Sequence, residues 1–87
     1  MNQFRKSDIA RSILETLNHA KGYAVPEASL RPQVNGLLRP PAKDDEWTAA
    51  TDMLAAREAM VRVPAELDPE LVQWAITERG RVLLATL

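Results

Sequence analysis

The sequence predicts one small α+β domain over residues 1–87, with a three-helix core, a β-hairpin and a closing C-terminal helix. Three observations predict it. Apolar residues recur at helical spacing through the first two thirds of the chain, and an alternating segment near the C-terminus reads as a strand that runs into a helix. The length is sufficient for one domain and too short for two. Nearly every large apolar side chain is therefore expected in the core.

The first helix is expected over residues 8–20, with Ser7 as its N-cap and Gly22 as the residue that stops it. Gly22 suits this place because glycine readily takes a left-handed conformation. Residues 23–25 are expected to form a minor third strand. The face of the helix that is expected to be buried consists of Ile9, Ile13, Leu14 and Leu17.

A second helix is expected over residues 26–38, beginning at Pro26, whose missing N–H has no partner in a first turn anyway. Its expected core residues are Ala28, Leu30, Val34, Leu37 and Leu38. Residues 42–45 lead into a third helix, which should end near residue 58 or 59. Its apolar stripe is Trp47, Ala50, Thr51 and Leu54.

A hairpin should follow, with strands over residues 60–63 and 71–76. Val72, Trp74 and Ile76 alternate on what should be the inward face of the return strand. Thr77 then reads as the N-cap of the closing helix. Glycine inside a helix is unfavourable, so Gly80 indicates a close approach of this turn to a neighbouring element.

Four segments together resemble the second half of small bacterial and phage-type winged helix-turn-helix proteins: LLRPP, EWTAATDMLAARE, AMVRV and VQWAITERGRVLL. The most specific part of the pattern is Trp74, Ile76, Thr77, Gly80, Arg81 and Leu84. The resemblance implies a three-helix core followed by a β-hairpin wing and a closing helix. In DNA-binding members of such families, the third helix enters the major groove and the wing contacts the backbone or the minor groove.

The charges are distributed unevenly along the chain. Residues 1–43 carry seven basic and three acidic residues, whereas residues 44–87 carry four basic and nine acidic residues. Between residues 44 and 58 five acidic residues accompany a single base, Arg57, so phosphates are expected to repel the third helix. This distribution argues against reading DNA with that helix and the wing.

The charge pattern therefore favours a binding module that contacts a protein partner through its acidic third helix and wing. The residues predicted to bind this partner are Asp45, Glu46, Asp52, Glu66 and Asp68. The alternative is a small DNA-binding transcriptional regulator that docks through its basic N-terminal half. The residues predicted to bind nucleic acid in that case are Arg5, Lys6, Arg11, Arg31, Arg39, Lys43 and Arg62.

The sequence predicts no enzyme, no metal, no cofactor and no small-molecule substrate. It contains no cysteine, no glycine-rich phosphate loop, no metal-ligand spacing and no nucleophile paired with a base. No signal peptide or membrane-spanning run is present, so a cytoplasmic protein without membrane contact is expected. The apolar C-terminal residues exceed what one helical face requires, which predicts a homodimer through the terminal helices; they are Val82, Leu83, Leu84 and Leu87.

Overall fold

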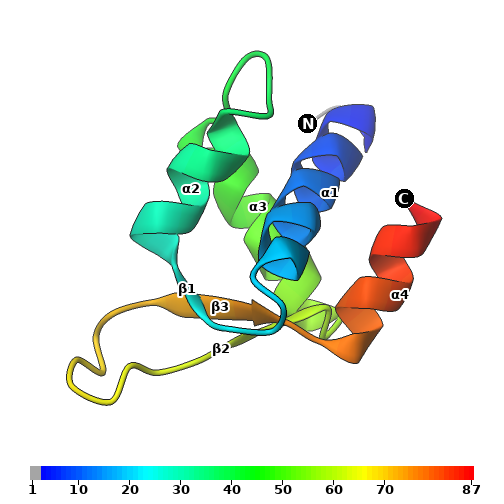
Figure 1. Ribbon diagram of the computed structural model, residues 1–87. Coiled ribbons are helices and arrows are strands. Elements are labelled where there is room, and N and C mark those ends of the chain that lie inside the picture. Colours follow the sequence, from blue (N-terminus) through cyan, green and yellow to red (C-terminus); the bar gives the residue numbers. More distant parts are fainter. Residues whose placement is uncertain (1–2) are drawn as a thin grey trace.

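The computed structural model describes residues 3–87 of the chain. These residues form helices on one side of a small antiparallel sheet, with a hairpin loop that extends away from the body (Figure 1). In chain order the elements are α1 (Gln3–His19), β1 (Val25–Pro26), α2 (Glu27–Asn35), α3 (Asp44–Ala56), β2 (Met60–Arg62), β3 (Gln73–Ile76) and α4 (Glu78–Thr86). The predicted order of helices and hairpin is confirmed.

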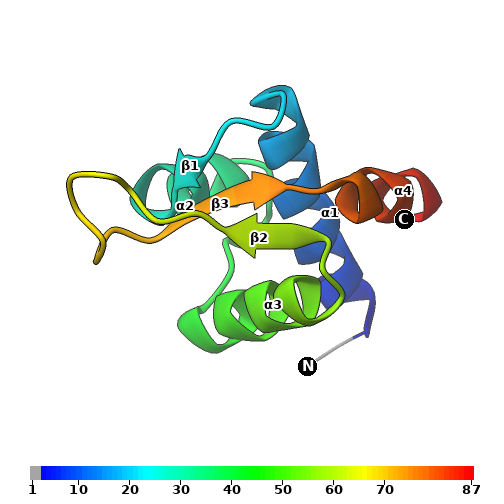
Figure 2. The same cartoon turned by 90° about the horizontal axis from the view of Figure 1, so that it is seen from below.

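The sheet has the strand order β1-β3-β2, and both pairings are antiparallel. Seen from below, β3 lies between the other two strands (Figure 2). Trp74 on β3 lies opposite both Val25 on β1 and Arg62 on β2. The minor third strand is therefore confirmed, although it is placed at Val25–Pro26, slightly later than predicted. Strand β3 is the element that joins the hairpin to the segment between α1 and α2.

Helix α1 is the centre of the core. It contacts α2, α3, α4 and β3, so each of the other helices rests against it. Five of its residues are completely buried: Ile9, Ala10, Ile13, Leu14 and Leu17. The four predicted core residues are all among them. Among the described residues, no helix has the length and apolar character needed to cross a membrane.

The sequence predicted the C-terminal end of α1 correctly but not its N-terminal end. The helix begins at Gln3, so the prediction that Ser7 caps it is wrong. Arg5 explains the longer helix, because its guanidinium contacts the loop before α3 and holds the first turn in place. The predicted stop is confirmed, since Gly22 has a φ of 89° and Lys21 before it has a φ of 55°.

Helix α2 is shorter than predicted at its C-terminal end. It ends at Asn35, because the Asn35 side chain accepts a hydrogen bond from the backbone N–H of Ala42 at 3.1 Å. That bond requires the chain to turn back after the helix. Leu37 is consequently 60% exposed, and Ala28 also faces solvent, so their predicted core roles are wrong. The other core predictions for this helix, Leu30, Val34 and Leu38, are confirmed.

The junction between β3 and α4 is confirmed as predicted. The Thr77 hydroxyl accepts a hydrogen bond from the backbone N–H of Gly80 at 3.0 Å, which is an N-cap. Gly80 is buried against the chain that leads into β2. A Cβ atom at this position would lie 2.0 Å from the Ala59 carbonyl oxygen and 2.7 Å from Ile76 Cγ1. Only glycine therefore allows α4 to pack this closely.

Replacing Gly80 with alanine is expected to lower the free energy of unfolding by about 1–3 kcal/mol, because the new methyl group meets rigid backbone. Urea denaturation followed by circular dichroism measures the change. The matched control is Gly36→Ala, where a Cβ would lie 3.3 Å from its nearest neighbour, the Gln33 carbonyl oxygen. Equal midpoints for the two variants would contradict the close approach at Gly80.

Candidate nucleic-acid interface

Helices α2 and α3 follow one another across a turn, and both pack on α1. Helix α3 begins after Lys43, whose backbone N–H donates a hydrogen bond to Glu46 Oε1 at 3.0 Å. Its buried face consists of the predicted stripe Trp47, Ala50, Thr51 and Leu54. The opposite face is exposed and carries Asp45, Thr48 and Asp52. The structure therefore presents a polar face of α3 to solvent along the length of the helix.

One carboxylate fixes α3 relative to the hairpin. Glu27, the first residue of α2, accepts hydrogen bonds at Oε1 from Trp47 Nε1 at 3.3 Å and from Trp74 Nε1 at 3.1 Å. Trp47 lies on α3 and Trp74 on β3. Hydrogen bonds to an ionised acceptor are stronger than neutral ones. Three elements are thus held at one point, and the orientation of α3 against the hairpin depends on it.

Arg31 extends this cluster toward the start of α3. Its Cζ lies 5.6 Å from the centroid of the Trp47 ring, a distance typical of a cation–π contact. Its guanidinium also forms an ion pair with Asp44, the first residue of α3. Arg31 therefore contacts both the buried and the exposed side of the same helix turn.

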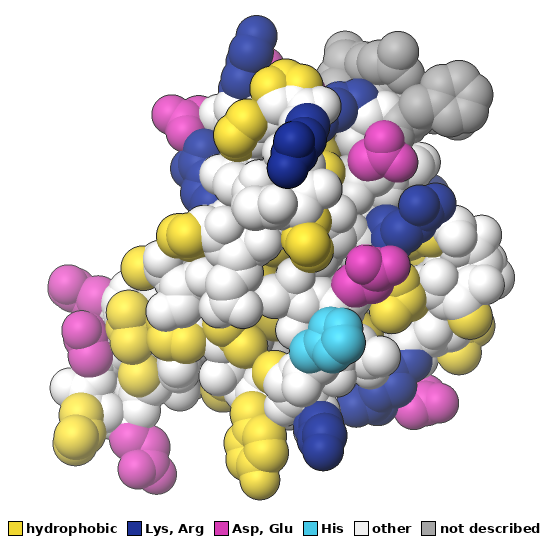
Figure 3. All heavy atoms as spheres, turned by 45° about the horizontal axis from the view of Figure 1, so that its top comes forward, with side chains coloured by type: hydrophobic (Ala, Val, Ile, Leu, Met, Phe, Trp, Pro, Cys, Tyr) yellow, Lys and Arg dark blue, Asp and Glu magenta, His cyan; other side chains and the backbone are white. Residues whose placement is uncertain are grey.

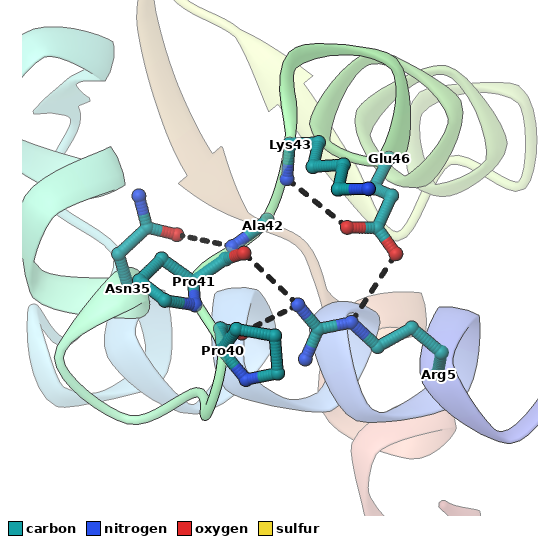
Figure 4. Close-up of polar contacts among 7 residues, drawn as sticks. All are labelled: Arg5, Asn35, Pro40, Pro41, Ala42, Lys43 and Glu46. Carbon is teal, nitrogen blue, oxygen red and sulfur yellow. Dashed lines mark hydrogen bonds and ion pairs between the residues drawn. The ribbon is translucent and has the colours of Figure 1, made fainter.

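A second arginine links α1 to the start of α3 (Figure 4). Arg5 Nε donates to Glu46 Oε2 at 3.2 Å, and its Nη2 donates to the carbonyl oxygens of Pro40 and Pro41. The side chains of Arg5 and Glu46 are only 18% and 16% exposed. The backbone N–H of Lys43 and, second, the Arg5 guanidinium hold the pKa of Glu46 below its usual value. This pair therefore stabilises the loop, and both of its charged groups are mostly covered by the protein.

Arginines from other elements neutralise part of the negative charge that the sequence assigns to the third helix. Three of the five acidic residues form ion pairs with arginines from α2, α1 and α4. These pairs are Asp44 with Arg31, Glu46 with Arg5, and Glu58 with Arg79 at 2.9 Å. The expected repulsion of phosphates counted only the charges between residues 44 and 58, and these three pairs lower it.

The residues predicted to bind a protein partner do not form one surface. Asp45 and Asp52 are exposed on α3, whereas Glu66 and Asp68 are exposed in the hairpin loop, where acidic side chains gather at the lower left of Figure 3. Glu46 is half-buried against Arg5. The structure thus removes one of the five from the surface and divides the remaining four between two elements.

The residues predicted to bind nucleic acid are divided into separate groups. Arg11 and Arg39 line a hollow between α1 and the turn after α2, where Asp8 and Glu15 also lie. Lys6 lies on the other side of α1, beside Arg57 and α4. Figure 3 shows basic side chains spread over α1, α2 and the turn after α2, with acidic ones among them. The basic N-terminal half is therefore not a single continuous surface.

The remaining basic residues of that set lie around α3. Lys43 precedes its first turn, and Arg31 is paired to that turn. Arg62 is exposed on β2, directly opposite Trp74 of β3. Residues directly opposite across two strands share a face of the sheet, so Arg62 stands on the side of Trp74 and hence of the helices. Of these three residues, Lys43 and Arg62 form no ion pair among residues 5–87.

Sequence reasoning assigned Trp47 and Trp74 to the core, and did not single out Glu27. Trp47 is buried at 4% exposure and Trp74 is half-buried, so their packing roles are confirmed. Their shared acceptor lies 20 residues before one and 47 residues before the other. No pattern of neighbouring residues in the sequence predicts a contact over such a separation. The one available signal was an acidic residue directly after Pro26, at the start of a helix.

The C-terminal residues behind the homodimer prediction are not equally exposed. Val82 is 60% exposed, whereas Leu83, Leu84 and Leu87 pack partly against the core. The homodimer stays a prediction. Within residues 3–87, no group of three or more histidine, aspartate and glutamate side chains is arranged to hold a metal ion. The predicted lack of enzymatic activity and of a cofactor also stays a prediction.

These elements define a winged helix-turn-helix domain, with α3 as its second helix and the β2–β3 hairpin as its wing. No protein-family model and no curated protein sequence matches the chain. The structure is similar to that of the transcriptional repressor CouR bound to a 23-mer DNA duplex, with a TM-score of 0.64 and 25% sequence identity. The similarity covers 87% of this chain and 48% of that chain. The chain thus spans about half the length of that repressor chain.

This similarity overturns the preferred functional prediction. A protein partner docked on the acidic third helix and wing was expected because DNA phosphates would be repelled there. The similar solved structure is instead that of a repressor on DNA, and the similarity covers most of this chain. The prediction of a protein-binding module is therefore wrong, and the alternative of a DNA-binding regulator is the better supported of the two.

Replacing Glu27 with alanine is expected to lower the free energy of unfolding by about 2–3 kcal/mol, because two indole N–H groups lose a charged acceptor. The two tryptophans should also become more exposed to water. Urea denaturation and the tryptophan emission maximum measure these effects. Glu27→Gln keeps an acceptor oxygen and should lose less. The control is Glu15→Ala on the exposed face of α1, and a Glu27→Ala protein as stable as this control would refute the role of Glu27.

The lowered pKa of Glu46 makes part of the stability depend on pH. The stabilisation is present above the pKa that Glu46 has in the unfolded chain, and it is lost as the pH falls through the lower folded-state value. Glu46→Gln should therefore be less stable than the natural protein at pH 7, and this difference should shrink toward pH 3. Urea denaturation at both pH values tests this. Glu70→Gln, an exposed change in the hairpin loop, is the control, and a difference that is constant with pH would count against the Glu46 pair.

Proposed function

We propose that the protein is a DNA-binding transcriptional regulator of the winged helix-turn-helix class. The observation that carries the proposal is the similarity of 87% of the chain to a repressor solved on a DNA duplex. The neutralisation of three acidic residues by arginines from other elements supports it, because it lowers the repulsion between α3 and phosphates. The regulator acts by binding and carries out no reaction.

Helix α3 is the element that enters the major groove in this proposal, as the second helix of a helix-turn-helix generally does. Lys43 and Arg62 then contact phosphates at the borders of the groove. Their places favour this docking, since Lys43 directly precedes the first turn of α3 and Arg62 stands on the sheet face shared with Trp74. Phosphate contacts of this kind position a protein on DNA without reading its sequence.

A second docking surface is the hollow lined by Arg11 and Arg39, which represents the basic N-terminal half of the chain. It is the less favourable of the two surfaces for two reasons. Asp8 and Glu15 lie in the same hollow and oppose phosphate. Arg5, which also lines it, is already occupied by Glu46 and by two carbonyl oxygens.

Titration of the protein against a fluorescent duplex at 50 and 200 mM salt tests both the function and the docking surface. The natural protein should bind, and its affinity should fall steeply with salt because counterions are released from DNA. Lys43→Ala and Arg62→Ala should each weaken binding and reduce the salt dependence by about one counterion. The matched pair of controls, Arg11→Ala and Arg39→Ala, removes the same charge and should change binding little.

Two results would contradict parts of the proposal in different ways. A protein that binds no duplex at 50 mM salt, while circular dichroism shows it folded, would overturn the regulator function. If Arg11→Ala and Arg39→Ala abolished binding while Lys43→Ala and Arg62→Ala did not, the protein would be a regulator that docks through its N-terminal half.

A further inference from the structure

The exposed face of α3 carries an unusual set of side chains for a helix that reads DNA. Asp45, Thr48, Ala49 and Asp52 follow the spacing i, i+3, i+4, i+7, which places them on one face of the helix. Asp45, Thr48 and Asp52 are exposed and Ala49 is half-buried. This face lies opposite the buried stripe that begins with Trp47. It is the surface of α3 that a major groove would meet.

Helix α3 lacks every side chain that usually reads purines. Between Asp44 and Ala56 there is no arginine, lysine, asparagine or glutamine. Bidentate contacts from Arg or Lys to guanine, and from Asn or Gln to adenine, are therefore unavailable to it. The polar groups that remain on the exposed face are two carboxylates, which only accept hydrogen bonds, and one hydroxyl.

The ion pairs of the structure separate the acidic residues that can act as readers from those that cannot. Asp44 is bound to Arg31 and Glu46 to Arg5. Asp45 and Asp52 form no ion pair with any other residue among residues 5–87, and both are exposed. Their carboxylates are thus the strongest acceptors that α3 offers to a groove.

The donors and acceptors that each base presents in the major groove determine which base can bind such a carboxylate. Guanine presents only acceptors in the major groove, and thymine presents an acceptor and a methyl group. The adenine amino group stands beside the N7 acceptor of the same base, which repels a carboxylate. Cytosine presents its N4 amino group, and aspartate and glutamate accept a hydrogen bond from it. Cytosine is therefore the base that an unpaired carboxylate on α3 selects.

The spacing of the two residues sets the spacing of the bases. Seven residues along a helix correspond to about 10.5 Å at a rise of about 1.5 Å per residue. Base pairs follow one another at about 3.4 Å, so the two carboxylates are about three base-pair steps apart. Both can therefore contact bases in one passage of the groove.

We propose that α3 reads cytosine at two positions about three base pairs apart, with Asp45 and Asp52 each accepting a hydrogen bond from a cytosine N4 amino group. The proposal rests on the regulator function proposed above and specifies the DNA that it takes. At either position guanine or thymine would place acceptor against acceptor, so the wrong base is rejected by repulsion as well as by a lost hydrogen bond.

Selection of duplexes from a randomised pool at 50 mM salt tests the proposal. The natural protein should enrich sites with two cytosines about three base pairs apart. Asp45→Asn and Asp52→Asn should each replace one of the cytosines by adenine, since an asparagine side chain pairs with adenine. The affinity of each variant for the original site should fall roughly tenfold. The matched control is Glu66→Gln, which removes one negative charge from the exposed hairpin loop and should keep both cytosines.

The outcomes distinguish this inference from the function on which it rests. If the natural protein binds no duplex from the pool, the regulator function fails and the base preference fails with it. If it binds duplexes without a base preference, or if both asparagine variants keep the two cytosines, the regulator function stands and the reading by Asp45 and Asp52 is overturned.

Discussion

The Glu27 carboxylate holds the two halves of the proposed interface together. One of its two oxygens, Oε1, accepts hydrogen bonds from an indole on α3 and from an indole on β3, and Glu27 is itself the first residue of α2. The helix that would read DNA and the strand that carries the wing are therefore positioned by the same group. Arg31 extends this arrangement, because it stacks on Trp47 and pairs with Asp44 at the exposed start of α3. The geometry of the surface thus follows from a polar cluster beneath it.

The same structure shows why charge counted along the chain misleads. Helix α3 carries four acidic residues, yet two of them, Asp44 and Glu46, form ion pairs with arginines from α2 and α1. Conversely, the sequence predicts one cationic surface in the basic N-terminal half, yet Arg5 forms an ion pair with Glu46, and Arg11 and Arg39 share a hollow with acidic residues. The field that a ligand meets depends on which charges remain unpaired after folding.

The fold was largely predictable where the signal is local. The Thr77 cap joins residues three positions apart and is confirmed. The close approach at Gly80 is also confirmed; its local signal was a glycine inside a helix, although the backbone that it approaches belongs to Ala59, far earlier in the chain. The end of α2 was not predictable, because Asn35 turns the chain back through a bond to Ala42 and leaves Leu37, an apolar residue, in solvent. The early start of α1 likewise depends on contacts that Arg5 makes with residues 35 to 41 positions away.

The sequence by itself determined the order of helices and strands, the buried stripes of α1 and α3, and the hairpin that runs into a capped closing helix. These features follow from periodicity and capping, which act over a few residues. Only the tertiary structure decided which charges are neutralised, which apolar residues stay exposed, and how α3 is oriented against the wing. Those features depend on pairs 7 to 47 residues apart, such as Asn35 with Ala42 and Glu27 with Trp74, and the chain must fold before such residues meet.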